Sequence, residues 1–363
     1  SSVSFVRRGE RFPVEDPALD TRWLVTPYLF DVAHREVDTN EETTELEWAP
    51  PTEILRRETV PDLWTSYWRV APTVATVGAD DDHGSAYVSV RALEVLRDAA
   101  ALGVERDEGD WPHLVKTARG LLDAKPAMAA VRNRVNRVMS VAGADRTPAA
   151  VESAATEAID AALAADRETA ASAREFVDDQ RVVTLSRSGT VLEALSRGDP
   201  EAVAVAESRP GGEGIGVAED LAAAGLEVTL TTDANLPAVV DDADVCLVGA
   251  DTVLPDGSVV NKVGSRALAL AAQDSDVRWY AVSASDKISP DGRVRLDPGD
   301  PATLYDRDAP LTVENPTFER VPARLVDGVV TEAGVLDADQ IQALSSVNAA
   351  RATWQARDVL AEE

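Results

Sequence analysis

The chain has 363 residues, 45% of them hydrophobic, so it is long enough to form two or three domains. Its 64 acidic and 35 basic residues give a formal charge of −29, which argues against direct nucleic-acid binding, because phosphate backbones attract clustered lysine and arginine. No apolar stretch predicts a membrane helix or a signal peptide. A single cysteine, Cys246, excludes an internal disulfide, and we expect a cytoplasmic protein.

The acidic residues are spread along the whole chain. This spread is typical of halophilic proteins, which stay solvated in strong salt through their acidic surfaces, although an acidic face for a basic partner is the alternative. Lysine is rare, and the lysines are Lys116, Lys125, Lys262 and Lys287.

Three regions follow one another. Residues 1–68 combine strand-like runs such as 23–32 with turns. Residues 69–175 show helical periodicity, with a first-turn proline at Pro148, and predict a helical domain. The helical stretches are 86–102, 113–124, 128–139 and 148–177.

Residues 176–363 alternate short apolar runs with helical stretches, which is typical of βαβ units and a parallel sheet covered on both faces. We therefore predict an α/β fold with a doubly wound parallel sheet. The strand-like runs are 182–185, 202–207, 227–232, 244–250 and 278–284, and the tail from about 335 has a helical pattern.

Ligands of open parallel sheets bind beyond the carboxyl ends of the strands. The first predicted strand is followed by Ser186, Arg187, Ser188, Gly189 and Thr190. Small hydroxyl residues and a glycine before a helix can cradle a phosphate with backbone N–H groups, although a simple helix cap gives the same pattern.

The second strand is followed by Arg209 before a proline, then two glycines and Glu213. This segment is either a ligand-binding loop or a plain turn with a surface arginine. Asp233, after the third strand, is a candidate cap for the next short helix.

The fourth strand ends at Asp251, and Asn261 and Lys262 precede the next helix. A carboxylate held at a strand end can act as a general acid or base, and a nearby lysine can bind phosphate. A structural ion pair between Asp251 and Lys262 is the alternative. The histidines show no metal-ligand spacing, so we expect no metal site, and Cys246 lies within an apolar strand as a core residue.

Several segments together resemble the initiation factor 2B family, which includes translation factor subunits and two aldose–ketose isomerases. They are ESRPGGEGIGVAEDLAAAGLEVTLTTDA, VCLVGADTVLPDGSVVNKVGSRALALAA, WYAVSASDK, AKPAMAAVRNRVNRVM and ENPTFERVPARLVDGVVTEAG, within residues 82–337. The resemblance implies a helical domain (69–175), a Rossmann-like domain (176–363), and a homodimer or higher homo-oligomer.

In the isomerases an Asp and a Cys are the acid/base pair, and the resemblance places Asp251 and Ser186 at these positions. A serine hydroxyl is a poorer proton donor than a thiol, whose pKa is about 8.5. Asn261 and Lys262 match the pair that binds substrate.

Three further positions depart from the isomerase pattern. Lys125 stands where the isomerases have an arginine, His83 lies near the place of another phosphate-binding arginine, and Glu213 replaces a substrate-binding glutamine. The resemblance implies that these residues, with Arg209, Ser188, Gly189 and Thr190, face the ligand.

Residues 1–68 resemble the second half of a Nudix hydrolase domain, an α+β fold, through RWLVTPYLFDV and TNEETTELEWAPPTEIL. The glutamate-rich Nudix box that would hold Mg²⁺ is absent, so the segment is either degenerate or preceded by more chain.

The resemblance suggests a regulatory protein that binds a sugar phosphate or nucleoside monophosphate without a cofactor. A translation initiation GTPase is a possible protein partner. The alternative is an isomerase acting on ribose 1,5-bisphosphate or methylthioribose 1-phosphate, and Nudix-type hydrolysis is a third function that this chain cannot perform as given.

Overall fold

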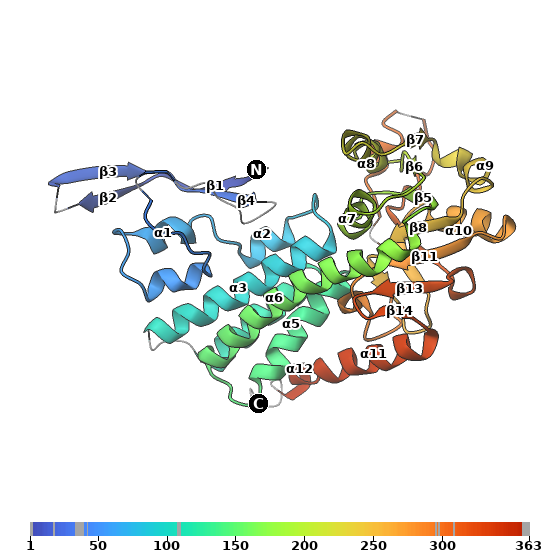
Figure 1. The fold of residues 1–363 in the computed structure, drawn as a ribbon. Helices are drawn as coiled ribbons and strands as arrows, with labels where there is room; N and C mark the ends of the chain where they lie inside the picture. The colour runs from blue at the N-terminus through green and yellow to red at the C-terminus, as the bar shows by residue number, and fades with distance from the viewer. Residues whose placement is uncertain are drawn as a thin grey trace.

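A computed structural model describes residues 3–16, 19–32, 40, 41, 43–106, 110–294, 296, 298–307 and 309–357. Figure 1 shows an N-terminal β-ribbon region at one end, a helical domain in the middle, and an α/β domain at the other end. None of the described helices is long and apolar enough to cross a membrane.

The N-terminal region consists of two separate antiparallel ribbons, formed by β1 with β4 and by β2 with β3. Their strands confirm the strand-like runs predicted here. Asp31 at the end of β4 accepts hydrogen bonds from Tyr87 (2.8 Å) and Arg91 (2.9 Å), which ties this ribbon to the helical domain. The elements are β1 (Val3–Arg8), β2 (Phe12–Asp16), β3 (Thr21–Val25), β4 (Tyr28–Val32), η1 (Pro51–Leu55) and α1 (Leu63–Trp68).

The helical domain packs its α-helices around one apolar core, as the alanine-rich periodicity predicts. Its longest helix, α6, starts where predicted: Thr147 caps it through a bond from the Ala150 N–H (3.2 Å), and Pro148 occupies the first turn. The helices are α2 (Val74–Gly78), α3 (Ser85–Arg106), α4 (Trp111–Ala124), α5 (Ala129–Ala142) and α6 (Pro148–Ala173).

The α/β domain contains a seven-stranded sheet of order β14-β13-β11-β8-β5-β6-β7, in which only the edge strand β14 is antiparallel. The predicted parallel sheet is therefore confirmed. The strands are β5 (Arg181–Leu185), β6 (Ala202–Ala206), β7 (Val228–Thr231), β8 (Val245–Gly249), β11 (Arg278–Val282), β13 (Gly328–Thr331) and β14 (Gly334–Leu336).

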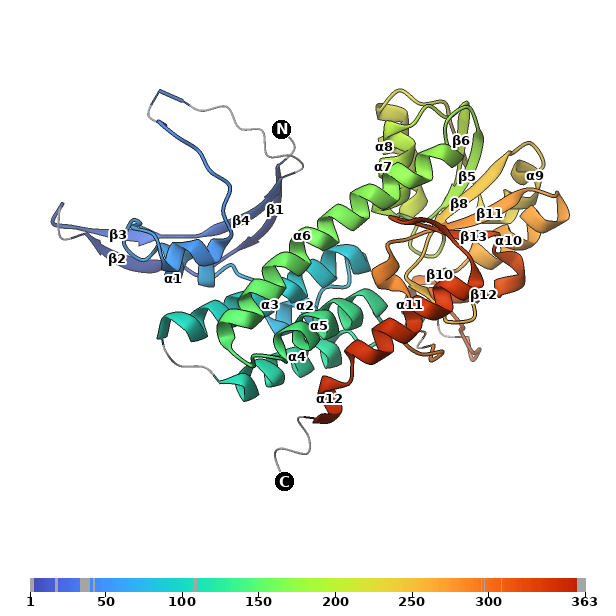
Figure 2. The same cartoon turned by 60° about the horizontal axis from the view of Figure 1, so that its bottom comes forward.

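Both faces of the sheet are covered, because successive strand residues point to opposite sides. Val182 packs with α7 and α8 on one face, whereas Val183 packs with α9 and α10 on the other. Figure 2 shows α11 and α12 running from the sheet back to the helical domain, where both contact α5. The helices are α7 (Gly189–Arg197), α8 (Glu213–Ala223), α9 (Leu236–Val240), α10 (Ser265–Asp274), α11 (Ala338–Arg351) and α12 (Trp354–Arg357).

A small antiparallel sheet of order β12-β10-β9 lies beyond the end of β8. The turn between β9 and β10 includes Gly257, whose positive φ of 80° suits glycine. The strands are β9 (Thr252–Val253), β10 (Val259–Lys262) and β12 (Phe318–Val321), and the remaining short 3-10 helices are η2 (Arg174–Phe176), η3 (Asp233–Asn235), η4 (Ser285–Lys287), η5 (Pro301–Thr303) and η6 (Ala323–Leu325).

Candidate functional site

The strand order reverses between β5 and β8. The chain runs from β5 through β6 to β7 in one direction and then returns to place β8 on the other side of β5. The loops after these two strands therefore diverge and leave a crevice between them, which is where open α/β sheets bind ligands.

Glycine lets the two loops approach each other closely. A Cβ on Gly249, the last residue of β8, would lie 2.6 Å from the Cβ of Ser188. Ser188 in turn caps α7, accepting a bond from the Val191 N–H at 3.4 Å. Ser186 has a left-handed φ of 61°, which is uncommon for a residue other than glycine.

A cavity of about 300 Å³ occupies this crevice and extends to the helical domain; we call it the strand-end cavity. It brings together six of the predicted site residues, namely Ser186, Ser188, Gly189, Thr190, Asp251 and Asn261. The other lining residues are Gly84, Ser85, Ala86, Asp166, Leu185, Arg187, Glu193, Gly249, Ala250 and Lys287.

Asp251 and Asn261 are held at the cavity by the β9–β10 hairpin. The Asp251 N–H donates to the Val260 carbonyl at 2.9 Å, so the second strand of the hairpin lies beside Asp251. The buried Asn261 amide donates to the Ser265 hydroxyl at 2.9 Å. Asp251 and Asn261 therefore line the cavity from adjacent positions of one hairpin.

Lys287 is the cation of this cavity that the sequence interpretation did not assign to the site. It lies in η4, and its ammonium donates to the Ala250 carbonyl at 2.8 Å. Burial lowers the pKa of Lys287 and raises that of Asp251, while the two groups attract each other. The sequence did contain an indication of this role, because Lys287 ends the segment SASDK, which follows the fifth predicted strand.

Four hydrogen bonds and ion pairs fix η4 against α5. Arg134 and Arg137 both contact the Asp286 carboxylate, Arg134 at 3.0 Å. Asn133 donates to the backbone carbonyls of Asp286 and Ile288, each at 2.7 Å. These contacts of the helical domain determine where Lys287 lies.

Asp166 lines the same cavity from α6 and was also missed by the sequence interpretation. Its Oδ1 is buried and has no hydrogen-bond partner, and the nearest cation is Arg134, 3.7 Å away. Burial raises the pKa of Asp166. Its distance in sequence from the strand ends gave no signal for this position.

The remaining predicted site residues do not line the strand-end cavity. Lys125 donates to Asp81 at 2.9 Å and to the Asp80 carbonyl at 2.7 Å. His83 contacts the Asp80 carboxylate at 2.8 Å. Both side chains are thus engaged by an acidic loop just before α3.

Arg209 and Lys262 are likewise paired with carboxylates. The Arg209 guanidinium contacts Glu207 at 3.0 Å and is 62% exposed, and Lys262 contacts Glu213 at 2.5 Å. Lys262 therefore makes its ion pair with Glu213 in the first turn of α8, while it still attracts the Asp251 carboxylate electrostatically. Asp233 is not a helix cap: it accepts from the N–H groups of Ser208 (2.8 Å) and Arg209 (2.7 Å).

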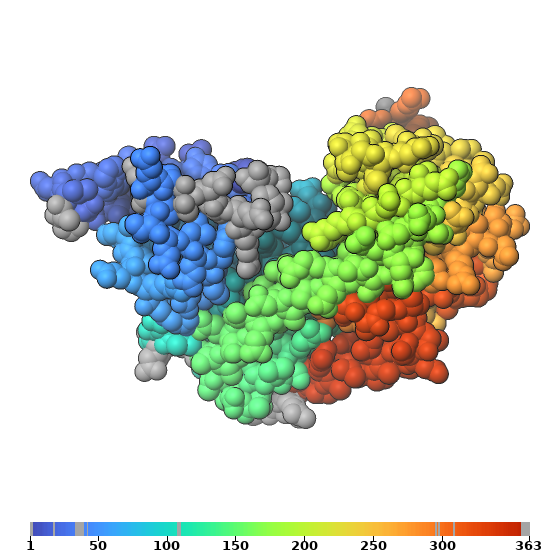
Figure 3. Space-filling view, in the orientation of Figure 1, coloured from blue at the N-terminus to red at the C-terminus, as the bar shows by residue number. Residues whose placement is uncertain are grey.

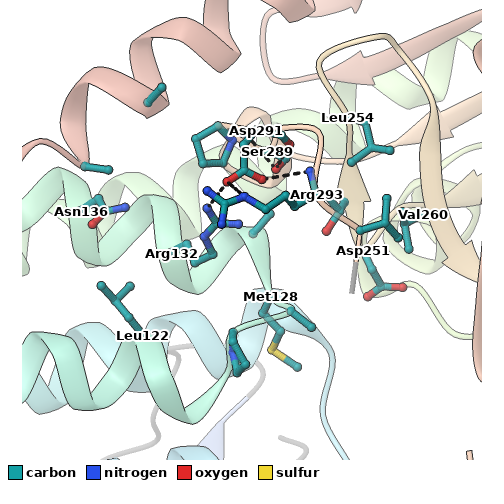
Figure 4. A pocket seen from close by; sticks show the side chains of 18 of the residues that line it. Leu122, Met128, Arg132, Asn136, Asp251, Leu254, Val260, Ser289, Asp291 and Arg293 are labelled. Atoms are coloured by element: carbon teal, nitrogen blue, oxygen red, sulfur yellow. Dashed lines mark hydrogen bonds and ion pairs between the residues drawn. The ribbon is translucent and has the colours of Figure 1, made fainter. Parts of the chain in front are cut away.

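A second cavity of about 580 Å³ lies on the other side of Asp251, between α4, α5, the small sheet and α11. Figure 4 shows Asp251 on its wall, with Arg132, Asp291 and Arg293 grouped at another side. Arg132 and Arg293 contact Asp291 at 3.0 and 3.4 Å, so one carboxylate joins both arginines. Asp251 thus separates two cavities.

Neither a metal centre nor a reactive thiol is found in the described part of the chain. No group of three or more His, Cys, Asp or Glu residues there is arranged to hold a metal ion. Burial in β8 raises the pKa of Cys246 to about 12, so the thiol is protonated and inert at neutral pH.

Residues 81–338 match the Initiation factor 2 subunit family, and the chain belongs to that family. An eIF-2B subunit 2-like protein of Pyrococcus abyssi is 29% identical over 277 residues, covering 74% of this chain and 96% of the relative. A ribose 1,5-bisphosphate isomerase of Haloterrigena turkmenica is 31% identical over 302 residues, covering 73% and 90%.

Solved structures show the same fold. The translation initiation factor eIF-2B structure from Pyrococcus horikoshii superposes with a TM-score of 0.62 at 25% identity, covering 72% of this chain and 94% of that one. The resemblance to the initiation factor 2B family is thereby confirmed. Because the family match starts at residue 81, the Nudix-like interpretation of residues 1–68 stays a prediction.

Proposed function

We propose that this protein binds a sugar phosphate or a nucleoside monophosphate in the strand-end cavity and serves a regulatory role in translation initiation or nucleotide metabolism. One observation carries the proposal: a cavity at the switch point of the sheet combines the turn before α7 with Asp251, Asn261 and Lys287. These groups offer a cation and backbone N–H groups for a phosphate, and a carboxylate and an amide for sugar hydroxyls.

Lys287 is the residue that tests the binding site most directly. Replacing it by methionine removes the charge but keeps an unbranched side chain, so ribose 5-phosphate affinity should fall by about tenfold or more, or about 1.4 kcal/mol. Lys116→Met, an exposed lysine on α4, is the matched control and should leave the affinity unchanged. Isothermal calorimetry that detects no sugar-phosphate or nucleoside-monophosphate binding to the folded wild-type protein would falsify the proposal.

Aldose–ketose isomerisation is the second candidate, and the position of Asp251 favours it. In a sugar 1-phosphate the ring C1–O4 bond breaks and O4 gains a proton. A base removes the proton on C2 and a proton is added at C1, while loss of the O2 hydroxyl proton leaves a ketone at C2 and the phosphate stays on O1. Asp251 lies on the cavity wall with a raised pKa, so it can both accept and return a proton. Ser186 lines the same cavity, at the position where the resemblance places the second acid/base residue, which is a cysteine in the isomerases.

Turnover distinguishes the two candidates. Ribose 1,5-bisphosphate and methylthioribose 1-phosphate are each incubated with the protein, and ketose formation is followed by NMR. Conversion by the wild type that disappears in Asp251→Asn, while the variant still binds ligand, establishes isomerisation. Binding of the ligand without any conversion leaves the regulatory function.

The family resemblance also leads us to infer a homo-oligomer and a translation initiation GTPase as partner. Light scattering of the purified protein measures its oligomeric state. Co-purification with the GTPase tests whether the two proteins bind each other. The net charge of −29 supports a halophilic protein, and both experiments therefore need concentrated salt as well as dilute buffer.

A further inference from the structure

The basic residues that the family resemblance assigned to ligand binding are engaged elsewhere in this chain. Each contacts a carboxylate and none lines the strand-end cavity: Lys125 with Asp81, His83 with Asp80, Arg209 with Glu207, and Lys262 with Glu213. A ligand in the cavity therefore meets a different set of charges from the one the resemblance implies.

The charges that do line the cavity are mostly negative. Asp166, Glu193 and Asp251 come from three separate parts of the chain, whereas the cations are Lys287 and Arg187. Glu193 contacts Arg197 at 3.0 Å, so its charge is partly neutralised. Arg187 is 51% exposed and contacts Asp220 at 2.7 Å, so its charge is partly neutralised and directed to solvent. Lys287 remains as the cation that faces the cavity interior.

Asp166 and Asp251 lie on different walls, one contributed by the helical domain and one by the α/β domain. Lys287 interacts electrostatically with both. Asp166 is 23% exposed, and the buried oxygen of its carboxylate has no hydrogen-bond partner in the described structure. The cavity therefore has one cationic centre flanked by two carboxylates.

This distribution limits how many phosphates the cavity can hold. A phosphate monoester carries a charge of about −1.5 to −2 at neutral pH. The first phosphate can bind at Lys287 and the N–H groups before α7. A second phosphate in a cavity of about 300 Å³ would lie close to Asp166, Glu193 or Asp251. The cations near these carboxylates, Arg134, Arg197 and Lys262, do not line the cavity, so a second phosphate would meet the carboxylates first.

We propose that the strand-end cavity selects a ribose that carries a single phosphate, and that Asp166 is the specificity-determining residue, accepting hydrogen bonds from the hydroxyls at the unphosphorylated end. This inference rests on the proposed sugar-phosphate site and narrows its ligand class. Ribose 1-phosphate, ribose 5-phosphate and a nucleoside monophosphate share this chemistry, and a bisphosphate does not.

Calorimetry on the full chain, in salt at which circular dichroism shows it folded, compares these monophosphates with ribose 1,5-bisphosphate. At least one monophosphate should bind about tenfold more tightly than the bisphosphate. Salt weakens this preference less than it weakens surface charge effects, because the carboxylates line a partly enclosed cavity. The comparison uses the wild type and does not depend on any variant folding.

Asp166→Asn keeps the size of the side chain and removes its charge. The variant should bind the bisphosphate at least about threefold more tightly than the wild type does, which reduces the preference for a monophosphate over the bisphosphate. Asp160→Asn, an exposed position on the same helix, should leave the preference unchanged. Glu193→Gln gives a second variant with the same expected direction.

The results separate the two proposals. If the bisphosphate binds as tightly as every monophosphate, the single-phosphate inference is wrong while the sugar-phosphate site stands. If Asp166→Asn leaves the ratio of affinities unchanged, Asp166 does not determine specificity. If no sugar phosphate binds at all, the proposed function and this inference are both overturned.

Discussion

Asp286 joins the helical domain to the segment that carries Lys287, so its replacement should be costly. The carboxylate is 3% exposed and contacts Arg134, which is 1% exposed, and Arg137. Asp286→Asn keeps the shape of the side chain but removes the close counter-charge from both guanidinium groups, and Arg134 is left with Asp166 at 3.7 Å. Removing one partner of a buried ion pair typically costs about 3–5 kcal/mol.

That loss is large compared with the total stability of a domain, about 5–15 kcal/mol. With a denaturant dependence of about 3 kcal/mol per molar urea, the unfolding midpoint should fall by about 1–1.7 M. Urea unfolding followed by circular dichroism measures this shift. Sugar-phosphate affinity should fall as well, because η4 loses its attachment to α5.

Asp291→Asn is the matched control, because Asp291 pairs with Arg132 on the same helix but remains 27% exposed. A partly exposed pair contributes about 0–1 kcal/mol, so this variant should unfold close to the wild type. If Asp286→Asn is no less stable than Asp291→Asn, the buried carboxylate does not hold the two domains together, and the reasoning fails.

Three further predictions concern other parts of the fold. Burial raises the pKa of Asp251, so its ionisation costs stability as the pH rises above the ordinary Asp value of about 3.9. The melting temperature of Asp251→Asn should therefore rise relative to that of the wild type as the pH is raised from this value, and a difference that stays constant with pH contradicts the prediction. The Cys246 thiol, with its pKa raised to about 12, should resist alkylation in the folded protein and react in urea, whereas equal rates would show that it is accessible. A Cβ at Gly214 would overlap the Ala206 carbonyl oxygen, so Gly214→Ala should lower stability by about 1–3 kcal/mol in urea unfolding, while Gly292→Ala, with open space around it, should not.

The α/β domain was predictable because its strands are short apolar runs and its helices are short and bounded by turns. Asp251 could be placed for the same reason, since it follows a strand whose end lies at the ligand-binding edge of the sheet. Asn261 lies on β10 of the small sheet, and it was assigned to the ligand through the family resemblance. Asp166 could not be placed, because it comes from a helix whose contact with the sheet depends on how the two domains pack. The strand β12 that completes the small sheet is similarly distant in sequence from its partner β10.

The ion pairs of the predicted site residues also could not be predicted from the sequence. Lys125 and Lys262 are rare lysines within the segments that resemble the family, so a role at the ligand was a reasonable expectation. Their actual partners are Asp81, in the loop before α3, and Glu213, in the first turn of α8, and only the folded chain determines where these residues lie. In a chain with so many acids, a lysine near a site has many competing carboxylates.

The long helix α6 belongs to both domains. Its first half packs Val151 and Ile159 in the core of the helical domain, and its end packs Ala170 and Ala173 against the sheet. Figure 3 shows it crossing the surface between the two parts. Its 26 residues span about 39 Å without a break. The two walls of the strand-end cavity are consequently linked through one continuous helix, and we expect the spacing between Asp166 and the sheet to stay nearly constant when a ligand binds.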